Sequence, residues 1–255
     1  MSNFVIDFLV EGNFFQQSVN RINFLDHQLP DKTTFLGLLT GFKLYFHAMP
    51  LIHVHHSNSC RLGLWQIAEG VPFFEQQIPY RSEALNQARK LQQLASRMVL
   101  NELEAGFPFD GVVLNHAGKP MLVSKNTYFS ISHTSGYAAA IIADVPVGLD
   151  VEVINDRVLK VVHKFLNAHE ISLLSELDAL ERVRYATLFW SIKEAVYKCW
   201  GKGGVDFSNH IRIVNFQQTD KGNATILFDC AEGQSFNVEY LLVENLWVTY
   251  VMASL

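Results

Sequence analysis

Four charged side chains in two short segments have the types and spacing needed for metal-assisted chemistry. Asp150 and Glu152 alternate with apolar residues across residues 147–152, a β-strand pattern that points both carboxylates to one face. Further along the chain, Glu194 and Lys198 are four residues apart in a helical pattern and should share a helix face. If the fold brings these faces together, three carboxylates meet one ammonium group. Such an oxygen set suits Mg²⁺, which keeps waters and is often completed by substrate phosphates.

A structural role for each segment is the alternative. Acidic residues at a strand end usually meet water, and a Glu–Lys pair on a helix surface contributes only about 0.3–0.5 kcal/mol. The apolar surroundings favour a site, because two like charges about 7 Å apart on a semi-buried strand would repel by roughly 2–3 kcal/mol. The histidines His53 and His55 are a weaker metal candidate: they share a strand face, but no third ligand follows at a suitable spacing, so a solvated strand is expected.

The composition indicates a globular protein. The 255 residues are 49% hydrophobic and 18% charged, enough for a packed core, and the net charge of −5 leaves no electrostatic footprint for nucleic acid. Cys60, Cys199 and Cys230 are odd in number and widely spaced, as expected of reduced thiols. The N-terminus lacks the basic region of a signal peptide, and no apolar run approaches the roughly 18–20 residues of a membrane span. We therefore expect a cytoplasmic protein with neither a membrane nor a nucleic-acid partner.

Two long helices are predicted. The first follows Ser82 as N-cap and ends before Gly106, and the second runs from about Glu181 to Trp200. The apolar stripe of the first helix consists of Leu85, Ala88, Leu91, Ala95, Met98, Val99 and Leu103. Asn167 and Glu170 form a capping box for a short helix between them.

Short strands follow each long helix, which predicts an α+β fold. The expected strands are residues 128–133, 137–143 and 147–153 after the first helix, and 211–216, 224–228, 236–242 and 246–252 after the second. A further strand is expected near residues 51–56. The layout predicts two pseudo-symmetric halves, residues 49–153 and 154–255, each a long helix on a small antiparallel sheet, with the active site between them. Residues 1–48 show no functional pattern.

Five segments occur in the order found in 4′-phosphopantetheinyl transferases, and the chain resembles the long, monomeric, surfactin-synthetase-activating type of that superfamily. The segments are Gly-Lys-Pro at 118–120, Phe-Ser-Ile-Ser-His-Thr at 129–134, residues 147–152, residues 165–167 with Glu170, and residues 190–198. The resemblance covers roughly residues 60–250. Its most specific part is the acidic strand combined with the Trp-Ser-x-Lys-Glu-Ala-x-x-Lys helix. It implies coenzyme A bound between two pseudo-symmetric halves, and it leaves residues 1–48 as an extension of unknown role.

The resemblance implies a reaction. Coenzyme A is cleaved at its pyrophosphate, its 4′-phosphopantetheine moves to a serine of an acyl, peptidyl or polyketide carrier protein, and adenosine 3′,5′-bisphosphate leaves. Asp150, Glu152 and Glu194 would hold Mg²⁺, and Lys198 would reach the phosphate that is attacked. Glu194, directly or through a metal-bound water, would take the serine proton.

The resemblance also implies contacts to the rest of coenzyme A. His133 matches the family's phosphate-contacting histidine, and Ser132 beside it has a hydroxyl to donate. Lys119, followed by Pro120, would line the adenine–phosphate end. Arg81 and Arg89 lie where the family has basic residues on or before the first long helix, with solvated or salt-bridged arginines as the alternative.

Two other functions are consistent with these residues. One is a non-catalytic relative that binds coenzyme A or a carrier protein, although the intact set of Asp150, Glu152, Glu194 and Lys198 argues against it. The other is a Mg²⁺-dependent nucleotide pyrophosphohydrolase, in which water replaces the serine. Dependence on a carrier protein distinguishes the transferase from the hydrolase.

Overall fold

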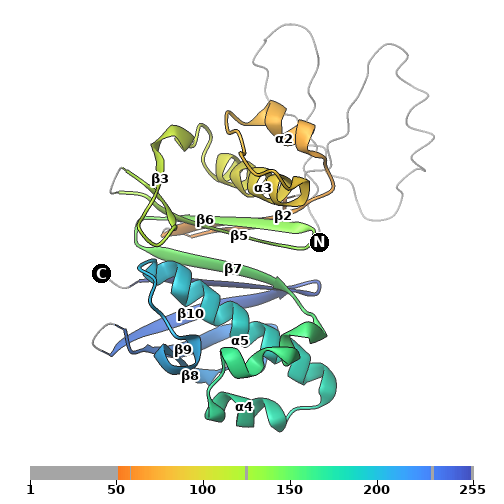
Figure 1. Ribbon diagram of the computed structural model, residues 1–255, viewed down its shortest axis with the longest axis vertical. Helices are drawn as coiled ribbons and strands as arrows, with labels where there is room; N and C mark the ends of the chain where they lie inside the picture. Colours follow the sequence, from red (N-terminus) through yellow and green to blue (C-terminus); the bar gives the residue numbers. More distant parts are fainter. Residues whose placement is uncertain (1–50, 58, 124–125, 231–232, 254–255) are drawn as a thin grey trace, which may run out of the picture. The chain divides into compact units, whose positions relative to one another are not determined.

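The computed structural model describes residues 51–57, 59–123, 126–230 and 233–253 (Figure 1). The predicted extension at residues 1–48 lies outside these residues. The described chain combines helices with antiparallel sheets, the α+β class that the sequence predicts. No helix in this part of the chain is long and apolar enough to cross a membrane.

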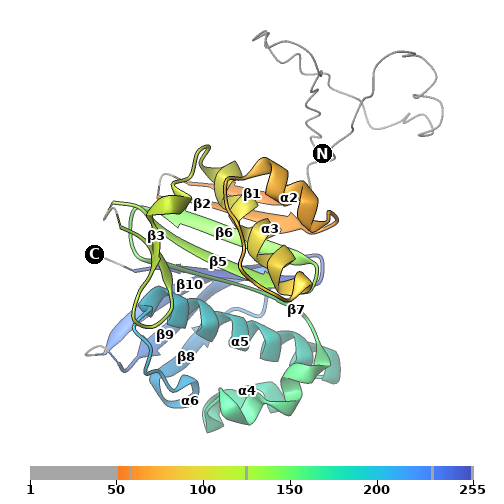
Figure 2. The ribbon, with the colours of Figure 1, turned by 45° about the horizontal axis from the view of Figure 1, so that its top comes forward.

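The first sheet has four antiparallel strands and is covered on one face by helices. Its order is β1 (Leu51–His56), β2 (Cys60–Gln66), β6 (Tyr137–Ala143) and β5 (Tyr128–Thr134). Helix α3 (Gln87–Leu103) packs on β6 and β2, and the short α2 (Val71–Gln77) packs on α3 (Figures 1 and 2). A close approach to α3 is possible because β6 carries alanines and β2 has Gly63, where a Cβ would lie 2.8 Å from Val99.

The second sheet has five antiparallel strands. Its order is β7 (Val147–Val153), β11 (Leu246–Met252), β10 (Gln234–Val243), β9 (Lys221–Phe228) and β8 (Ile211–Phe216). The long helix α5 (Ala179–Trp200) packs on β7 and β11. Shorter elements lie around α5: η2 (Asp156–Lys160), η3 (Val162–Lys164), α4 (Ala168–Ser175) and α6 (Phe207–His210). A separate ribbon, β3 (Val112–Leu114) with β4 (Pro120–Leu122), follows η1 (Phe109–Gly111) and contacts β5.

Strand β7 lies between the first sheet and α5, and its alternating sequence explains why (Figure 1). Val147, Leu149 and Val151 are fully buried in a core that also contains residues of β2 and β6. The alternating residues Gly148, Asp150 and Glu152 face α5. One strand therefore seals the core between the sheets with one face and presents carboxylates to α5 with the other.

Gly148 brings α5 unusually close to β7. A Cβ at this position would lie 1.9 Å from the carbonyl oxygen of Ala195 and 2.5 Å from the backbone nitrogen of Cys199. Because these are backbone atoms of the helix, no side-chain movement could relieve the clash. The glycine thus allows the helix to approach the strand two residues before Asp150.

Most predicted elements are confirmed, including the capping box of Asn167 and Glu170 and the end of α5 at Gly201, which has a φ of 63°. The predicted start of the first long helix is wrong. The helix begins at Gln87 with Asn86 as N-cap, whereas the Ser82 hydroxyl donates to the side chain of Gln93. The side-chain oxygen of Asn86 accepts the backbone N–H of Arg89, a stronger local signal than the apolar period. Leu85, assigned to the apolar stripe, precedes the helix and is 99% exposed.

Candidate functional site

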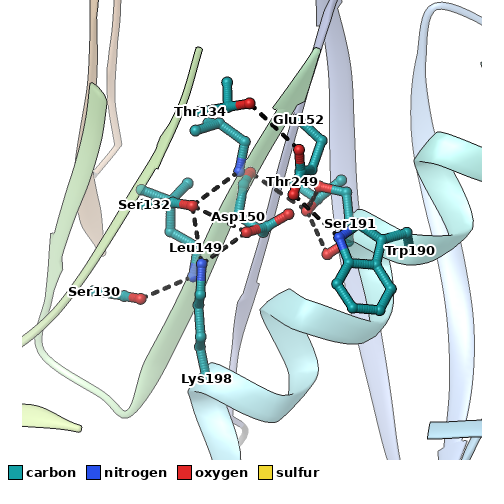
Figure 3. Close-up of polar contacts among 11 residues, drawn as sticks. Ser130, Ser132, Thr134, Leu149, Asp150, Glu152, Trp190, Ser191, Lys198 and Thr249 are labelled. Atoms are coloured by element: carbon teal, nitrogen blue, oxygen red, sulfur yellow. Dashed lines mark hydrogen bonds and ion pairs between the residues drawn. The ribbon is translucent and has the colours of Figure 1, made fainter. Parts of the chain in front are cut away.

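Asp150 is the centre of a hydrogen-bonded cluster between β5, β7 and α5 (Figure 3). Its Oδ1 accepts from the Lys198 ammonium at 2.7 Å and from the Ser132 hydroxyl at 2.9 Å. Lys198 also donates to the Ser132 oxygen at 2.9 Å, which closes a three-membered ring of polar groups. Asp150 is only 3% exposed, so the fold holds a carboxylate in the interior. Such a group requires cationic partners.

Hydroxyl groups on β5 explain how the two sheet edges meet at this point. Strand β7 is the edge of the second sheet and β5 is the edge of the first. The backbone N–H groups of Leu149 and Val151 donate to the hydroxyls of Ser130 and Ser132, at 3.0 and 3.3 Å. These serines replace the partner strand that an edge normally lacks. The Ser132 hydroxyl has one hydrogen, and it is donated to Asp150. In this structure Ser132 therefore orients the Asp150 carboxylate.

Glu152 lies on the same face of β7, closer to the N-terminal half of α5. The Trp190 indole donates to its Oε1 at 3.0 Å, and the Thr134 hydroxyl donates to its Oε2 at 3.4 Å (Figure 3). Burial and the nearby charge of Asp150 raise the pKa of Glu152 from 4.5 to about 7. A carboxylate in this position is costly to ionise without a further cation.

Glu194 is subject to the same electrostatic field from the helix side. Burial, followed by the charge of Asp150, raises its pKa from 4.5 to about 7, and only Lys198 acts in the opposite direction. A pKa near neutrality also suits a general base, for which an ordinary glutamate is too acidic. Asp150 and Lys198 are therefore in direct contact, and the charges of both act on Glu152 and Glu194.

A divalent cation fits the chemistry of this cluster. Among the residues that the structure describes, no three His, Cys, Asp or Glu side chains are arranged so that they could hold a metal ion together. However, Asp150 Oδ2 is buried and has no hydrogen-bond partner. The unpartnered oxygen of Asp150 and the raised pKa values of Glu152 and Glu194 show that the cluster lacks positive charge, and carboxylate oxygens are ligands that suit Mg²⁺.

A cleft of about 600 Å³, including space open to solvent, lies beside the cluster. Three elements line it: residues 117–120 of the β3–β4 ribbon, residues 129–131 of β5, and the end of α5 with Tyr197, Lys198 and Gly201. Lys198 belongs to both the cleft and the acidic cluster. A molecule bound in this cleft would reach the carboxylates at the Lys198 ammonium.

Lys119 and Pro120 line the cleft, as a ligand-binding role requires. The Lys119 ammonium donates to the backbone carbonyls of Val147 and Cys199, at 3.2 and 3.5 Å. Burial lowers its pKa. Lys119 therefore connects the β3–β4 ribbon, which lines the cleft, to β7 and to the last turn of α5.

Of the residues predicted to contact the phosphates of coenzyme A, only some lie near one another. His133 is exposed, and its pKa is lowered by partial burial, then by the charge of Lys198, and less by Arg97 and Arg89. Arg89 is thus part of the field around His133, whereas exposed Arg81 donates to the backbone carbonyl of Glu75 and makes no described contact with the cluster. Arg97, over the ring of Tyr80 at 4.8 Å, was not predicted as a site residue. In the sequence, Arg97 lies off the apolar stripe of the predicted helix, which is the one signal that it points away from the core.

Two charged residues of the recognised segments have a structural role instead. Lys193 and Glu170 are 0% exposed and form an ion pair of 2.7 Å. Lys193 also donates to the carbonyls of Phe207 and Ile211, and Glu170 accepts from the backbone N–H of Ile213. Every donor and acceptor is used, so the pair joins α4, α5 and β8.

Comparison with known proteins agrees with this geometry. A sequence model of the 4′-phosphopantetheinyl transferase superfamily matches residues 146–251, which include the acidic strand and α5. The 4′-phosphopantetheinyl transferase psf-1 of Bacillus pumilus is 28% identical over 174 residues, 66% of this chain and 73% of that protein. The transferase gsp of Aneurinibacillus migulanus is 33% identical over 120 residues, 44% of this chain and 50% of that protein. The transferase Sfp of Bacillus subtilis (strain 168) is 31% identical over 87 residues, 34% of this chain and 39% of that protein.

The similarity to named 4′-phosphopantetheinyl transferases supports the assignment of this chain as an enzyme of the transferase class. The chain is similar to the 4′-phosphopantetheinyl transferase superfamily, whose model matches residues 146–251.

Proposed function

We propose that the protein transfers the 4′-phosphopantetheine group of coenzyme A to a serine of an acyl, peptidyl or polyketide carrier protein. The serine oxygen forms a bond to the phosphorus on the pantetheine side of the pyrophosphate, and the bond from that phosphorus to the bridging oxygen breaks. Adenosine 3′,5′-bisphosphate leaves with the electron pair. The observation that carries the proposal is the buried Asp150–Lys198 pair beside an open cleft, whose charges also act on Glu152 and Glu194.

We assign a separate role in the reaction to each residue of the cluster. Asp150, Glu152 and Glu194 would hold Mg²⁺, which when bound neutralises the charge of the pyrophosphate and of the leaving group. Lys198 lines the cleft and would donate to the phosphate that is attacked. Glu194, with a pKa of about 7, would accept the serine proton.

The cleft supports a location for coenzyme A. With its phosphates at Lys198, the ligand would extend along residues 117–120, and His133 and Arg89 would take the 3′-phosphate. We further propose that residues 49–153 and 154–255 are two pseudo-symmetric halves, with β7 of the first range added to the sheet of the second, and that the enzyme acts as a cytoplasmic monomer. Ser132 then acts by orienting Asp150 and Lys198.

Intact-mass spectrometry of an apo acyl carrier protein tests the proposal. The carrier protein is incubated with the protein, coenzyme A and Mg²⁺, with a second sample in EDTA. We expect the carrier to gain one phosphopantetheine group in the first sample and none in the second. No gain on several types of carrier protein, with coenzyme A intact, would contradict transfer and favour a binding relative. Cleavage of coenzyme A without any carrier would favour the pyrophosphohydrolase.

A further inference from the structure

The loop of the β3–β4 ribbon is closed by one side chain. Asn115 Oδ1 accepts the backbone N–H groups of Ala117 and Lys119, both at 2.9 Å. The backbone of the same residue pairs with Lys119 and Gly118 at 3.0 and 2.9 Å. An asparagine that accepts from the backbone two residues ahead is a local device that fixes a turn. The carboxamide oxygen therefore fixes the shape of residues 115–119 from within.

The other end of the same carboxamide leaves the loop. Asn115 Nδ2 donates to the carbonyl oxygen of Gly201 at 2.7 Å, a contact between residues 86 positions apart. Gly201 is the left-handed residue that ends α5, one turn after Lys198. Lys119 strengthens this junction, since its aliphatic chain lies so close to Gly201 that an added Cβ would be 2.7 Å from Lys119 Cδ.

These contacts join two of the elements that line the cleft. Residues 117–120 form one wall, and Tyr197, Lys198 and Gly201 form another. The ribbon is also held by Leu122, which is buried in the core, and by the Lys119 ammonium on the carbonyls of Val147 and Cys199. Its other side chains give little support, because Val113, Leu114 and Met121 are 45–70% exposed. The bridge from Asn115 to the end of α5 is thus one of the contacts that set the separation of the two walls, beside those of Lys119.

We propose that Asn115 is a positioning residue for coenzyme A, which holds the 115–119 loop against the end of α5 so that the cleft is formed before the ligand binds. The inference rests on the proposed function, because coenzyme A is the ligand assigned to the cleft. Asn115 has no role in the chemical step and acts through the loop wall. Loss of the bridge should weaken binding of coenzyme A, because the ligand would then have to order the loop.

The variant Asn115→Asp separates the two ends of the carboxamide. One carboxylate oxygen can still accept the loop N–H groups, but the other would face the Gly201 carbonyl and cannot donate to it. Asn115→Ser is the second variant, since a hydroxyl can close the turn but is too short to reach α5. His116→Ala is the matched control, because His116 is an exposed neighbour in the same loop. For each, calorimetry measures the affinity for coenzyme A, and kinetics measure kcat and both KM values.

We expect both Asn115 variants to bind coenzyme A about tenfold more weakly, which corresponds to about 1.4 kcal/mol. The KM for the carrier protein and kcat should change by less than about twofold, and His116→Ala should match the wild type. Unchanged affinity for coenzyme A in folded Asn115→Asp and Asn115→Ser would overturn the inference, even if their melting temperatures fall. Failure of the wild type to bind coenzyme A would refute the proposed function itself, which is a distinct result.

Discussion

Replacing Glu194 by glutamine should stabilise the metal-free protein while removing its activity. Glu194 is held where burial and Asp150 disfavour its charge, and only Lys198 opposes them. Glutamine has nearly the shape of a protonated glutamate but cannot ionise. The substitution therefore removes an electrostatic cost of the folded state without leaving a cavity.

The size and the pH dependence of the effect follow from the pKa. A rise from 4.5 in the unfolded chain to about 7 in the folded protein corresponds to about 3 kcal/mol, at about 1.4 kcal/mol per pKa unit. Because the folded state holds the proton more tightly, stability falls as the pH rises from 4.5 through 7, and the full cost is present above 7. Partial exposure of Glu194 reduces the expected gain to about 1–3 kcal/mol at pH 8.

Urea unfolding in EDTA, followed by tryptophan fluorescence between pH 5 and pH 8.5, measures this gain. The free energy of unfolding of Glu194→Gln should clearly exceed that of the wild type at pH 8, and the difference should be much smaller at pH 5. Glu176→Gln is the control, since Glu176 is an exposed residue between α4 and α5. In Mg²⁺ the difference in unfolding free energy should shrink or change sign, because binding of the cation stabilises the wild type more than the variant.

Two results would refute this reasoning. A loss of stability at pH 8 in EDTA would mean that the Glu194 carboxylate is a favourable group in the folded protein. A gain of the same size at pH 5 and pH 8 would mean that the ionisation of Glu194 is not its cause.

Four further substitutions test the site and its supports. Asp150→Ala should nearly abolish transfer while circular dichroism stays native, and wild-type turnover would refute the metal assignment. Lys198→Ala should lower kcat more than it weakens coenzyme A binding, because the ammonium acts on the transferred phosphate; equal effects on both would contradict that role. Gly148→Ala should cost roughly 3 kcal/mol or more in denaturant unfolding, since the added Cβ meets the backbone of α5. Lys193→Met should cost roughly 3–5 kcal/mol in the same assay, because it leaves Glu170 buried and unpaired, and a small change would mean that the pair is not needed.

The sequence predicts the local part of this architecture well. Hydrophobic alternation in residues 147–153 defines β7 and the face of its carboxylates, because side chains alternate along any strand. The capping box at Asn167 and the left-handed Gly201 are likewise local signals, and both helix ends are found there. The late start of α3 shows the limit, since an apolar period can continue into a segment that the better N-cap, Asn86, leaves outside the helix.

Only the tertiary structure decides how these elements meet. The Lys198–Ser132 hydrogen bond joins residues 66 positions apart, and the Asn115–Gly201 bond joins residues 86 positions apart. The sequence alone determined which residues could do the chemistry and on which faces they lie, because those properties depend on neighbours along the chain. The orphaned oxygen of Asp150, the raised pKa values of the glutamates and the bridged cleft arise from burial and from charges on other elements, which exist only in the folded protein.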